Sequence, residues 1–246
     1  MRLYSDLAEH YFDIEKPGRK FEEEIHFLTD TFKKYRIQTA VDVGCGSGEH
    51  VKELHQRGWK ILGIDISPTM IEVAKTRHPS CKFEVGDMAK YNLKTPVDSI
   101  ICMFGSFNYL FETEEIRNFL SNINRNLKPA GIFILETWNA EPIRKIKRKP
   151  ISHVSTVKSG GSTIRRNRGF RLYRSEGSVM VEVNYVYNLE KKEIKDKHIM
   201  RVFHSEEIQT FLNEQKFEIL NIYGNFTEGK FTKRSGRILV VAKKRS

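Results

Sequence analysis

Long apolar runs, paired cysteines and metal-ligand spacings are all missing from this chain of 246 residues. No apolar stretch approaches the ~18 residues that a membrane-spanning helix needs, and the N-terminus lacks the apolar core of a signal peptide. The three cysteines, Cys45, Cys81 and Cys102, have neither a disulfide-framework nor a zinc-site spacing, and the histidines suggest no metal either. These absences predict a cytoplasmic protein without a metal or a membrane partner.

Acidic residues are missing from residues 142–175, where 11 of the chain's 42 Lys and Arg lie. The other 31 basic residues are matched by 31 acidic ones elsewhere, so the net charge of +11 is a local property of this stretch. Two interpretations are open. The stretch is either a solvated loop or a site for anions, such as the phosphates of a substrate or of RNA.

The first 140 residues alternate between two patterns. Short apolar runs typical of buried strands alternate with segments whose apolar residues recur at helical spacing. Strands are expected at 39–44, 60–66, 81–87, 98–105 and 131–138, and helices at 20–35, 48–58, 67–78 and 112–128. This alternation predicts an α/β fold with a Rossmann-like, doubly wound, mainly parallel sheet.

The pattern changes after the fifth predicted strand, which "PAG" at 129–131 is expected to separate from the preceding helix by a turn. Residues 151–203 show period-two stretches broken by Gly, Asn and Asp, which predicts an antiparallel β insertion or lid. A helix capped by Ser205 and two more strands follow. The expected organisation is 1–140 as helical cover and cofactor-binding core, 141–203 as basic loop and antiparallel substrate or lid subdomain, and 204–246 as the completion of the core sheet.

A glycine-rich loop follows the first predicted strand, with Gly44, Gly46 and Gly48 at alternate positions. Glycines there allow a tight turn and a close approach of a ligand to the backbone. A dinucleotide-binding G-x-G-x-x-G motif needs glycine at position 49, where Glu49 places a carboxylate at the start of the helix. The G-x-x-x-x-G-K-[ST] phosphate loop is absent too, so a pyrophosphate is disfavoured.

Acidic residues end the next two predicted strands. Asp65 lies 19 residues after Gly46, where its carboxylate can accept from both ribose hydroxyls. In "GDM" at 86–88, Asp87 can accept from an exocyclic amine, and Met88 offers a polarizable apolar face to an adenine ring. Together with the glycine loop, these residues favour a nucleoside with an amino-acid-like tail.

These motifs resemble those of the class I S-adenosylmethionine-dependent methyltransferases over about residues 35–140. Asp42 and the three glycines match that family's first motif, Asp65 matches its second, and "GDM" its third. The resemblance implies S-adenosylmethionine as cofactor, with the glycine loop at its methionine portion and the backbone near Met103 at its ammonium. The cofactor-binding set that it implies is Tyr11, Arg19, Asp42, Gly44, Gly46, Gly48, Asp65, Ile66, Met70, Asp87, Met88 and Met103.

A second resemblance concerns the methyl acceptor. "CMFGSFNYL" at 102–110 lacks the N-P-P-[YF] sequence of amine-specific DNA and glutamine methyltransferases. It is similar to the stretch in methyltransferases that N-methylate nucleotide-linked amino sugars, as are "HYFDIEKPGRKFEEEI", "VGDM", "ILETW", "RLYRSEGSVMVEVNYVY" and "VFHSEEIQTFL", in the same order. This resemblance implies a small-molecule acceptor, nucleotide-linked or otherwise phosphorylated. It also places Tyr11 over the cofactor and Arg19 near the cofactor's carboxylate.

The same resemblance implies the catalytic candidates Tyr109, Tyr11 and Glu136. Tyr109 falls where the amino-sugar enzymes commonly place a histidine beside the accepting amine, and Glu136 and Trp138 fall where a substrate ring could be gripped. A tyrosine with a pKa of ~10 can orient an amine but is a poor proton acceptor at neutral pH. No base is needed if the amine binds neutral.

Other functions stay open at this point. They are methylation of RNA through residues 142–175, O-methylation of another small metabolite, dinucleotide-dependent oxidation, and non-catalytic binding. The RNA hypothesis is weakened because the basic stretch holds only two stacking aromatics, Phe170 and Tyr173, and the oxidoreductase hypothesis is weakened by Glu49. The sequence leaves the acceptor, the number of methyl groups and the oligomeric state undecided.

Overall fold

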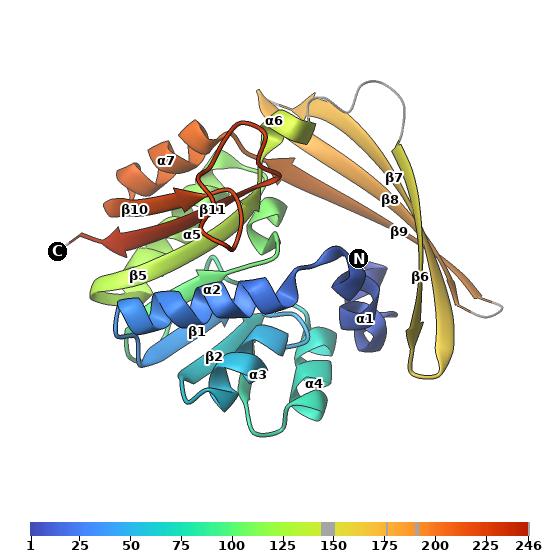
Figure 1. Cartoon of the computed structure of the whole chain (residues 1–246), viewed down its shortest axis with the longest axis horizontal. Coiled ribbons are helices and arrows are strands. Elements are labelled where there is room, and N and C mark those ends of the chain that lie inside the picture. Colours follow the sequence, from blue (N-terminus) through green and yellow to red (C-terminus); the bar gives the residue numbers. More distant parts are fainter. Residues whose placement is uncertain (144–150, 176, 190–191, 246) are drawn as a thin grey trace.

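The computed structural model describes residues 1–143, 151–175, 177–189 and 192–245, which form two β-sheets (Figure 1). The larger sheet consists of β1 (Thr39–Val43), β2 (Lys60–Asp65), β3 (Lys82–Val85), β4 (Val97–Cys102), β5 (Leu127–Trp138), β10 (Phe217–Tyr223) and β11 (Arg237–Lys244). Its strand order is β10-β11-β5-β4-β1-β2-β3. Strands β1 to β5 are parallel, whereas β11 is antiparallel to both β5 and β10. The strand order reverses between β1 and β4, which makes this edge the expected ligand site.

Helices cover both faces of this sheet (Figure 1). They are α2 (Phe21–Lys34), α3 (Glu49–Gln56), α4 (Pro68–Arg77), α5 (Thr113–Asn126) and α7 (Ser205–Glu214). One buried apolar cluster, with Phe32 and Leu54, packs α2, α3 and α4 on the sheet, and another, with Phe119 and Leu212, packs α5 and α7 on it. The predicted doubly wound α/β fold is therefore confirmed.

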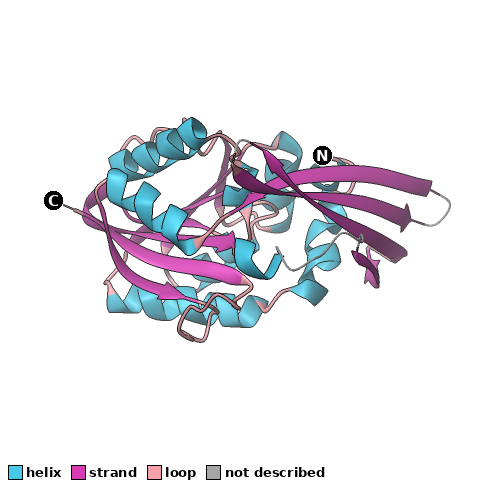
Figure 2. Ribbon diagram, turned by 90° about the horizontal axis from the view of Figure 1, so that it is seen from above, coloured by secondary structure: helices cyan, strands magenta, loops and turns pink. Residues whose placement is uncertain are grey.

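The smaller sheet is the predicted antiparallel insertion. Its strands β6 (Ile151–Ser159), β7 (Ser162–Ser175), β8 (Ser178–Leu189) and β9 (Lys192–Val202) pair in sequence order. These long strands extend away from the core (Figure 2). The basic run within 144–150 lies outside the described residues.

The N-terminal segment lies between the core and the smaller sheet (Figure 1). Its short helices are η1 (Arg2–Tyr4), η2 (Ala8–His10), α1 (Tyr11–Glu15) and η3 (Lys16–Gly18); two other short helices, η4 (Ser106–Tyr109) and α6 (Ala140–Ile143), follow β4 and β5. Leu3, Leu7 and Ile14 of this segment pack in one buried cluster with Val183 and Met200 of the sheet. We call the side of the sheet that carries these contacts the inner face.

Two local predictions are wrong and one is confirmed. Ser67 caps α4 as predicted, since its Oγ accepts from Met70 N at 3.3 Å. The cap of α7 is His204 and not Ser205: His204 forms a capping box with Glu207, and Ser205 is the first helical residue. "PAG" is not a turn between elements, because β5 already starts at Leu127 and accommodates Ala130 at a φ of 58°.

Among the described residues, no helix is long and apolar enough to cross a membrane, and no group of three or more His, Cys, Asp or Glu side chains could hold a metal ion.

Candidate active site

The glycine loop lies at the carboxyl end of β1, next to the reversal in strand order. Gly46 has a φ of 56°, and a Cβ built on it would touch both Tyr11 Cε1 and Met70 Cε at 3.4 Å. Tyr11 and Met70 therefore lie directly over the loop. Gly44 serves another purpose, because a Cβ there would come within 2.4 Å of Ser106 Oγ. The absence of a side chain at Gly44 therefore makes room for η4, a packing role that sequence spacing alone could not reveal.

Glu49 occupies the start of α3, where a pyrophosphate would bind in a dinucleotide enzyme. Its carboxylate accepts from Ser47 Oγ at 2.6 Å and from Arg77 Nη1 at 3.4 Å. The N-terminus of this helix is thus already supplied with a negative charge. This contact supports the sequence argument against a dinucleotide.

Asp65 ends β2 and points its carboxylate at the glycine loop. Its Oδ2 accepts from Gly46 N at 2.9 Å, and its Oδ1 accepts from Ser67 N at 2.9 Å. Each carboxylate oxygen can accept a second hydrogen bond, so two ribose hydroxyls could still be bound. Ile66 follows with 69% of its surface exposed, and Val85, the neighbour of Asp65 in β3, is 51% exposed. Such exposed apolar side chains at the edge of a sheet suit the flat face of an adenine ring.

The two residues that follow β3 in "GDM" have partners within the protein. Asp87 Oδ1 accepts from Ala89 N at 2.9 Å, so this carboxylate shapes the turn after the strand. Met88 packs against the apolar core, and its carbonyl accepts from Asn122 Nδ2 at 3.1 Å. Met103 is also buried in the core. The structure thus places all three near this edge of the sheet while giving each a packing or turn role.

A buried group of charges lies behind the glycine loop, and its central member, Glu24 of α2, carries no signal in the sequence that marks it as part of the site. Arg19 donates to both carboxylate oxygens of Glu24, one of them from Nε at 3.3 Å. His50 Nε2 lies 3.0 Å from Glu24 Oε2 and 3.2 Å from Arg19 Nη2. The Arg19 guanidinium also stacks 3.9 Å from the centre of the Phe104 ring, next to η4.

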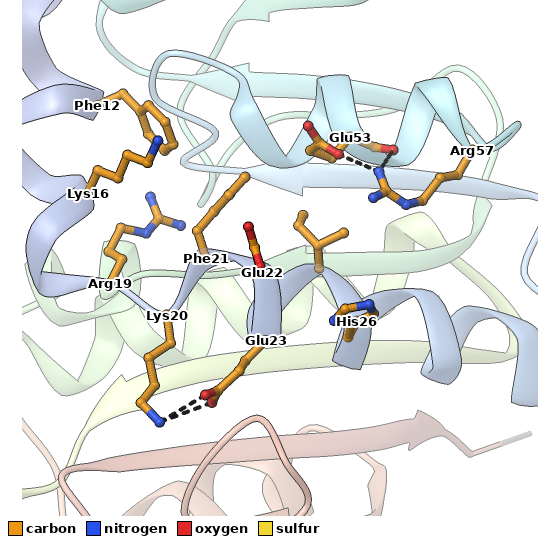
Figure 3. A pocket seen from close by; sticks show the side chains of 11 residues that line it. Phe12, Lys16, Arg19, Lys20, Phe21, Glu22, Glu23, His26, Glu53 and Arg57 are labelled. Carbon is orange, nitrogen blue, oxygen red and sulfur yellow. Dashed lines mark hydrogen bonds and ion pairs between the residues drawn. The ribbon is translucent and has the colours of Figure 1, made fainter.

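Arg19 reaches this position from the link between η3 and α2. Figure 3 shows it beside Phe21 at one end of a surface pocket of about 710 Å³, which η3, α2 and α3 line. The guanidinium N–H groups of Arg19 that do not donate to Glu24 could bind a carboxylate of a ligand. The prediction that Arg19 lies near a cofactor carboxylate is therefore compatible with its geometry.

Asp42, at the end of β1, is the one member of this region with an unsatisfied oxygen among the described residues. Its side chain is almost completely buried, Oδ2 has no hydrogen-bond partner there, and His50 Nδ1 lies 3.8 Å from this oxygen. Burial raises the pKa of Asp42 to about 6, although the proximity of His50 opposes this shift. A buried acceptor without a donor is costly, so this oxygen marks a place for a ligand's donor group.

The first prediction concerns Asp42. Because its pKa rises from 3.8 to about 6 on folding, its contribution to stability is complete below pH 3.8 and is lost as the pH rises through 6. We expect Asp42→Asn to abolish this loss, so that from pH 4 to pH 7 the variant gains about 2–3 kcal/mol of unfolding free energy relative to wild type. Urea unfolding at a series of pH values measures the difference.

Asp98 supplies the matched control for this experiment. It accepts from Thr39 N and Gln38 N, and although burial opposes it, hydrogen bonds from Lys128 and Thr39 lower its pKa to about 2. Asp98→Asn should therefore show the opposite sign: it should lose stability relative to wild type as the pH rises from 2 through 3.8, and the difference should then stay nearly constant up to pH 7. A pH-independent difference between wild type and Asp42→Asn would contradict the buried, partnerless state of Asp42.

Tyrosines connect the glycine loop to the inner face. The ring of Tyr11 lies 5.6 Å from that of Tyr4, and Tyr4 Oη lies 2.9 Å from Tyr109 Oη. Trp138 packs in the same apolar cluster as these three tyrosines. The structure thus brings together three aromatic residues that the sequence associates with cofactor and acceptor, Tyr11, Tyr109 and Trp138, and adds Tyr4 between them.

Glu136, predicted to be catalytic, has protein partners on both of its carboxylate oxygens. It is only 2% exposed; one oxygen accepts from Phe104 N at 2.7 Å and the other from Arg237 Nη1 at 2.7 Å. The first contact fixes the turn that leads from β4 into η4, and the second ties β5 to β11. Arg237 is 101 residues away in the chain, so this partner could not be predicted from the local pattern around Glu136, whose catalytic role stays a prediction.

Known proteins that resemble this chain agree with the geometry. Residues 40–131 match the family of methyltransferase domains. The dTDP-4-amino-2,3,4,6-tetradeoxy-D-glucose N,N-dimethyltransferase of Saccharopolyspora spinosa is 31% identical over 101 residues, which is 41% of this chain and 41% of that protein. The dTDP-3-amino-3,6-dideoxy-alpha-D-glucopyranose N,N-dimethyltransferase of Streptomyces fradiae is 25% identical over 188 residues, 74% of this chain and 70% of that protein. S-adenosylmethionine-bound CalS10, an amino pentose methyltransferase from Micromonospora echinaspora, shares the fold with a TM-score of 0.73 over 93% of each chain, at 23% identity.

The chain therefore carries a class I S-adenosylmethionine-dependent methyltransferase domain, and S-adenosylmethionine is its cofactor. Within that class it is similar to the amino-sugar N-methyltransferases. The residues at the sheet edge fit this cofactor: Asp65 retains acceptor capacity, Asp42 has an orphaned buried oxygen, and Ile66 is exposed beside them.

Proposed function

We propose that this protein methylates the amine nitrogen of a small, amino-sugar-like molecule. The observation that carries the proposal is the position of Tyr109 in η4, the short helix after β4. Its hydroxyl is hydrogen-bonded to Tyr4, whose ring packs against that of Tyr11 above the glycine loop. An acceptor bound at Tyr109 would thus be next to the cofactor. The names of the curated relatives, which are N,N-dimethyltransferases of dTDP-linked amino sugars, support an amine as the acceptor.

The chain's own residues would bind and orient the reactants. When bound, S-adenosylmethionine supplies an electrophilic methyl group on a sulfonium. Asp65 would hold the ribose, Ile66 and Met88 would border the adenine, and Arg19 would bind the carboxylate. Tyr11 would cover the site from above and exclude water. Because methyl transfer is a displacement with a good leaving group, the protein contributes mainly by this positioning.

A phosphate group on the acceptor would find a partner on β7. Arg166 and Arg168 project from the inner face, and Arg166 is paired with Glu15 of α1. Arg168 has no carboxylate within ion-pair distance among the described residues, and its buried Nε has no hydrogen-bond partner there. Burial and the neighbouring charge of Arg166 lower the pKa of Arg168. A bound anion would offset both the burial of the Arg168 charge and its repulsion by Arg166. A guanidinium group can bind two phosphate oxygens at once, through two parallel hydrogen bonds.

The direct test is an assay with purified protein and S-adenosylmethionine, followed by mass spectrometry of the acceptor. The probes are dTDP-3-amino-3,6-dideoxy-α-D-glucopyranose, the same sugar with hydroxyl in place of amine, and bulk tRNA. Methylation of the amine alone supports the proposal. Methylation of the hydroxy sugar or of tRNA alone would replace it with O-methylation or with an RNA methyltransferase.

The second prediction concerns Arg168. Arg168→Gln should raise the KM for the dTDP-linked amine by about 10- to 100-fold, which is the value of one charge-assisted contact, with little change in affinity for S-adenosylmethionine. Arg171→Gln is the matched control, because Arg171 lies on the same strand but is exposed on the opposite face. Equal effects of the two substitutions would show that only the general basic charge matters.

A further inference from the structure

A buried chain of hydrogen bonds leads from Tyr109 into the inner face of the smaller sheet. Tyr109 Oη lies 2.6 Å from His198 Nδ1, and His198 Nε2 lies 3.0 Å from Asp196 Oδ2. His198 is only 1% exposed. These residues come from η4 and β9 and are 89 positions apart in the sequence. No part of the function proposed above uses His198 or Asp196.

The direction of each hydrogen bond follows from the charge on Asp196. Its Oδ2 also accepts from Leu3 N at 2.7 Å. Burial raises the pKa of Asp196, but the hydrogen bonds from His198 and from backbone N–H groups outweigh burial and lower it to about 2. The carboxylate is therefore ionised at neutral pH and needs a donor, which places a proton on His198 Nε2. In the neutral imidazole, a lone pair then remains on Nδ1.

Tyr109 consequently donates its own proton to His198 Nδ1. The Tyr4 hydroxyl can donate to Tyr109 Oη at 2.9 Å, which uses one of the two lone pairs on that oxygen. The other lone pair is free to accept from an N–H of a bound acceptor. Burial raises the pKa of Tyr109, so the hydroxyl stays protonated unless a proton arrives from the acceptor as its own moves to His198.

The far side of the chain of bonds reaches solvent. Asp196 lines a surface groove of about 410 Å³, together with Arg2, Tyr185 and the exposed Lys195 and Lys197. The ring of Tyr185 packs edge-on against His198 at 4.9 Å. The titratable groups that lie close to Tyr109 and His198 on neighbouring elements are Tyr4, Tyr11, Glu15 and Tyr185. Arg166 and Arg168 lie close to Tyr185.

We propose that Tyr109, His198 and Asp196 form a proton path from the acceptor nitrogen to solvent, an inference that rests on the proposed N-methylation. As the N–C bond forms and the C–S bond breaks, the nitrogen becomes cationic and has one proton to lose. Tyr109 Oη takes that proton while its own proton moves to His198 Nδ1, and the Nε2 proton leaves through Asp196 to water. Tyr109 touches the reacting nitrogen, whereas His198 and Asp196 are positioning residues that act through it.

The path is tested without any acceptor by nitrogen NMR of protein labelled at its histidines. The His198 signals are assigned by their absence from His198→Gln. We expect the Nε2–H tautomer at neutral pH, and a shift of the Nδ1 resonance in Tyr109→Phe, which removes the donor. His26→Gln is the control for the substitution itself, because His26 is exposed on α2 and lies outside this site. An Nδ1–H tautomer, or an Nδ1 resonance that ignores Tyr109→Phe, overturns the proposal.

The kinetic test uses dTDP-3-amino-3,6-dideoxy-α-D-glucopyranose as acceptor. His198→Gln should lower kcat at pH 7 by ~100-fold, the low end for a lost proton acceptor, with unchanged affinity for S-adenosylmethionine. The loss should shrink several-fold by pH 9, because hydroxide can then take the proton from the methylated nitrogen without His198. A loss that is the same at every pH indicates a merely structural role for His198 and overturns the proposal. If the wild type fails to methylate this amine, the proposed acceptor is wrong, and the tautomer measurement alone decides the proton path.

Discussion

Replacing Glu24 by alanine is expected to lower the free energy of unfolding by about 3–5 kcal/mol, the usual cost of breaking a buried ion pair by removing one partner. Glu24 is completely buried and is contacted by both Arg19 and His50. Without it, Arg19 would be left as a buried cation with no carboxylate beside it, in contact with His50 and with the faces of the Phe104 and Phe21 rings. Urea unfolding at pH 7 measures the loss.

The pH dependence provides a second readout for the same variant. Burial raises the pKa of Glu24, but His50 and Arg19 outweigh burial and lower it from 4.5 to about 2. Its stabilising effect is therefore present above pH 4.5 and is lost as the pH falls through 2. The difference between wild type and Glu24→Ala should be constant from pH 6 to pH 8 and should narrow in acid.

Glu23 offers the matched control on the same helix. Its partner is Lys20 at 2.9 Å; Lys20 is exposed and Glu23 is partly exposed, so Glu23→Ala should change stability by less than about 1 kcal/mol. A comparable loss for both variants would attribute the effect to the helix and not to the buried pair. If Glu24→Ala cost less than 1 kcal/mol, the buried network would not hold the N-terminal segment in place.

Much of the fold could be predicted from local pattern. The apolar runs that became β1 and β2, and the helical spacing that became α2 and α4, are each contained within a dozen or so neighbouring residues. Ser67 could be identified as a cap because its partner, Met70 N, is three residues away. His204 could not be identified as a cap in the same way. The start of α7 at Ser205 depends on where β9 and the bridge between Asn139 and Phe203 end, and both involve residues that are distant in sequence.

The site was predictable where a motif lies on one loop and unpredictable where partners meet from distant elements. The glycine loop and Asp65 are brought together by adjacent parallel strands, a relation that sequence spacing conveys. His198 and Asp196 could not be assigned to the site from the sequence, because period-two alternation on β9 indicates a strand but not which side chain will face Tyr109. An isolated tyrosine is a poor proton acceptor, as the sequence predicts for Tyr109. Tyr109 can take a proton from the acceptor only because its own proton can move to His198.

Replacing Asp65 by alanine should weaken binding of S-adenosylmethionine by about 1–3 kcal/mol, or about 5- to 150-fold, the range for hydrogen bonds to a charged group. Two contributions are expected, because the carboxylate would bind the ribose and also accepts from Gly46 N and Ser67 N of the protein. Asp65→Asn separates them. Its amide oxygen can still accept from one of these N–H groups, so its loss of affinity should be smaller than that of alanine. Calorimetric titration with S-adenosylhomocysteine measures all three proteins.

The control for Asp65 lies in the same sheet but at the amino ends of the strands, whereas Asp65 lies at the carboxyl ends. Asp98 is also a carboxylate that accepts from backbone N–H groups, those of Thr39 and Gln38, but it lies at the amino end of β4. Asp98→Ala should lower thermal stability and leave the affinity for S-adenosylhomocysteine within about twofold, a difference of ~0.4 kcal/mol. If Asp65→Ala likewise changed only stability, the acid at the end of β2 would be a loop support, and the ribose would have to be bound by other residues at this edge.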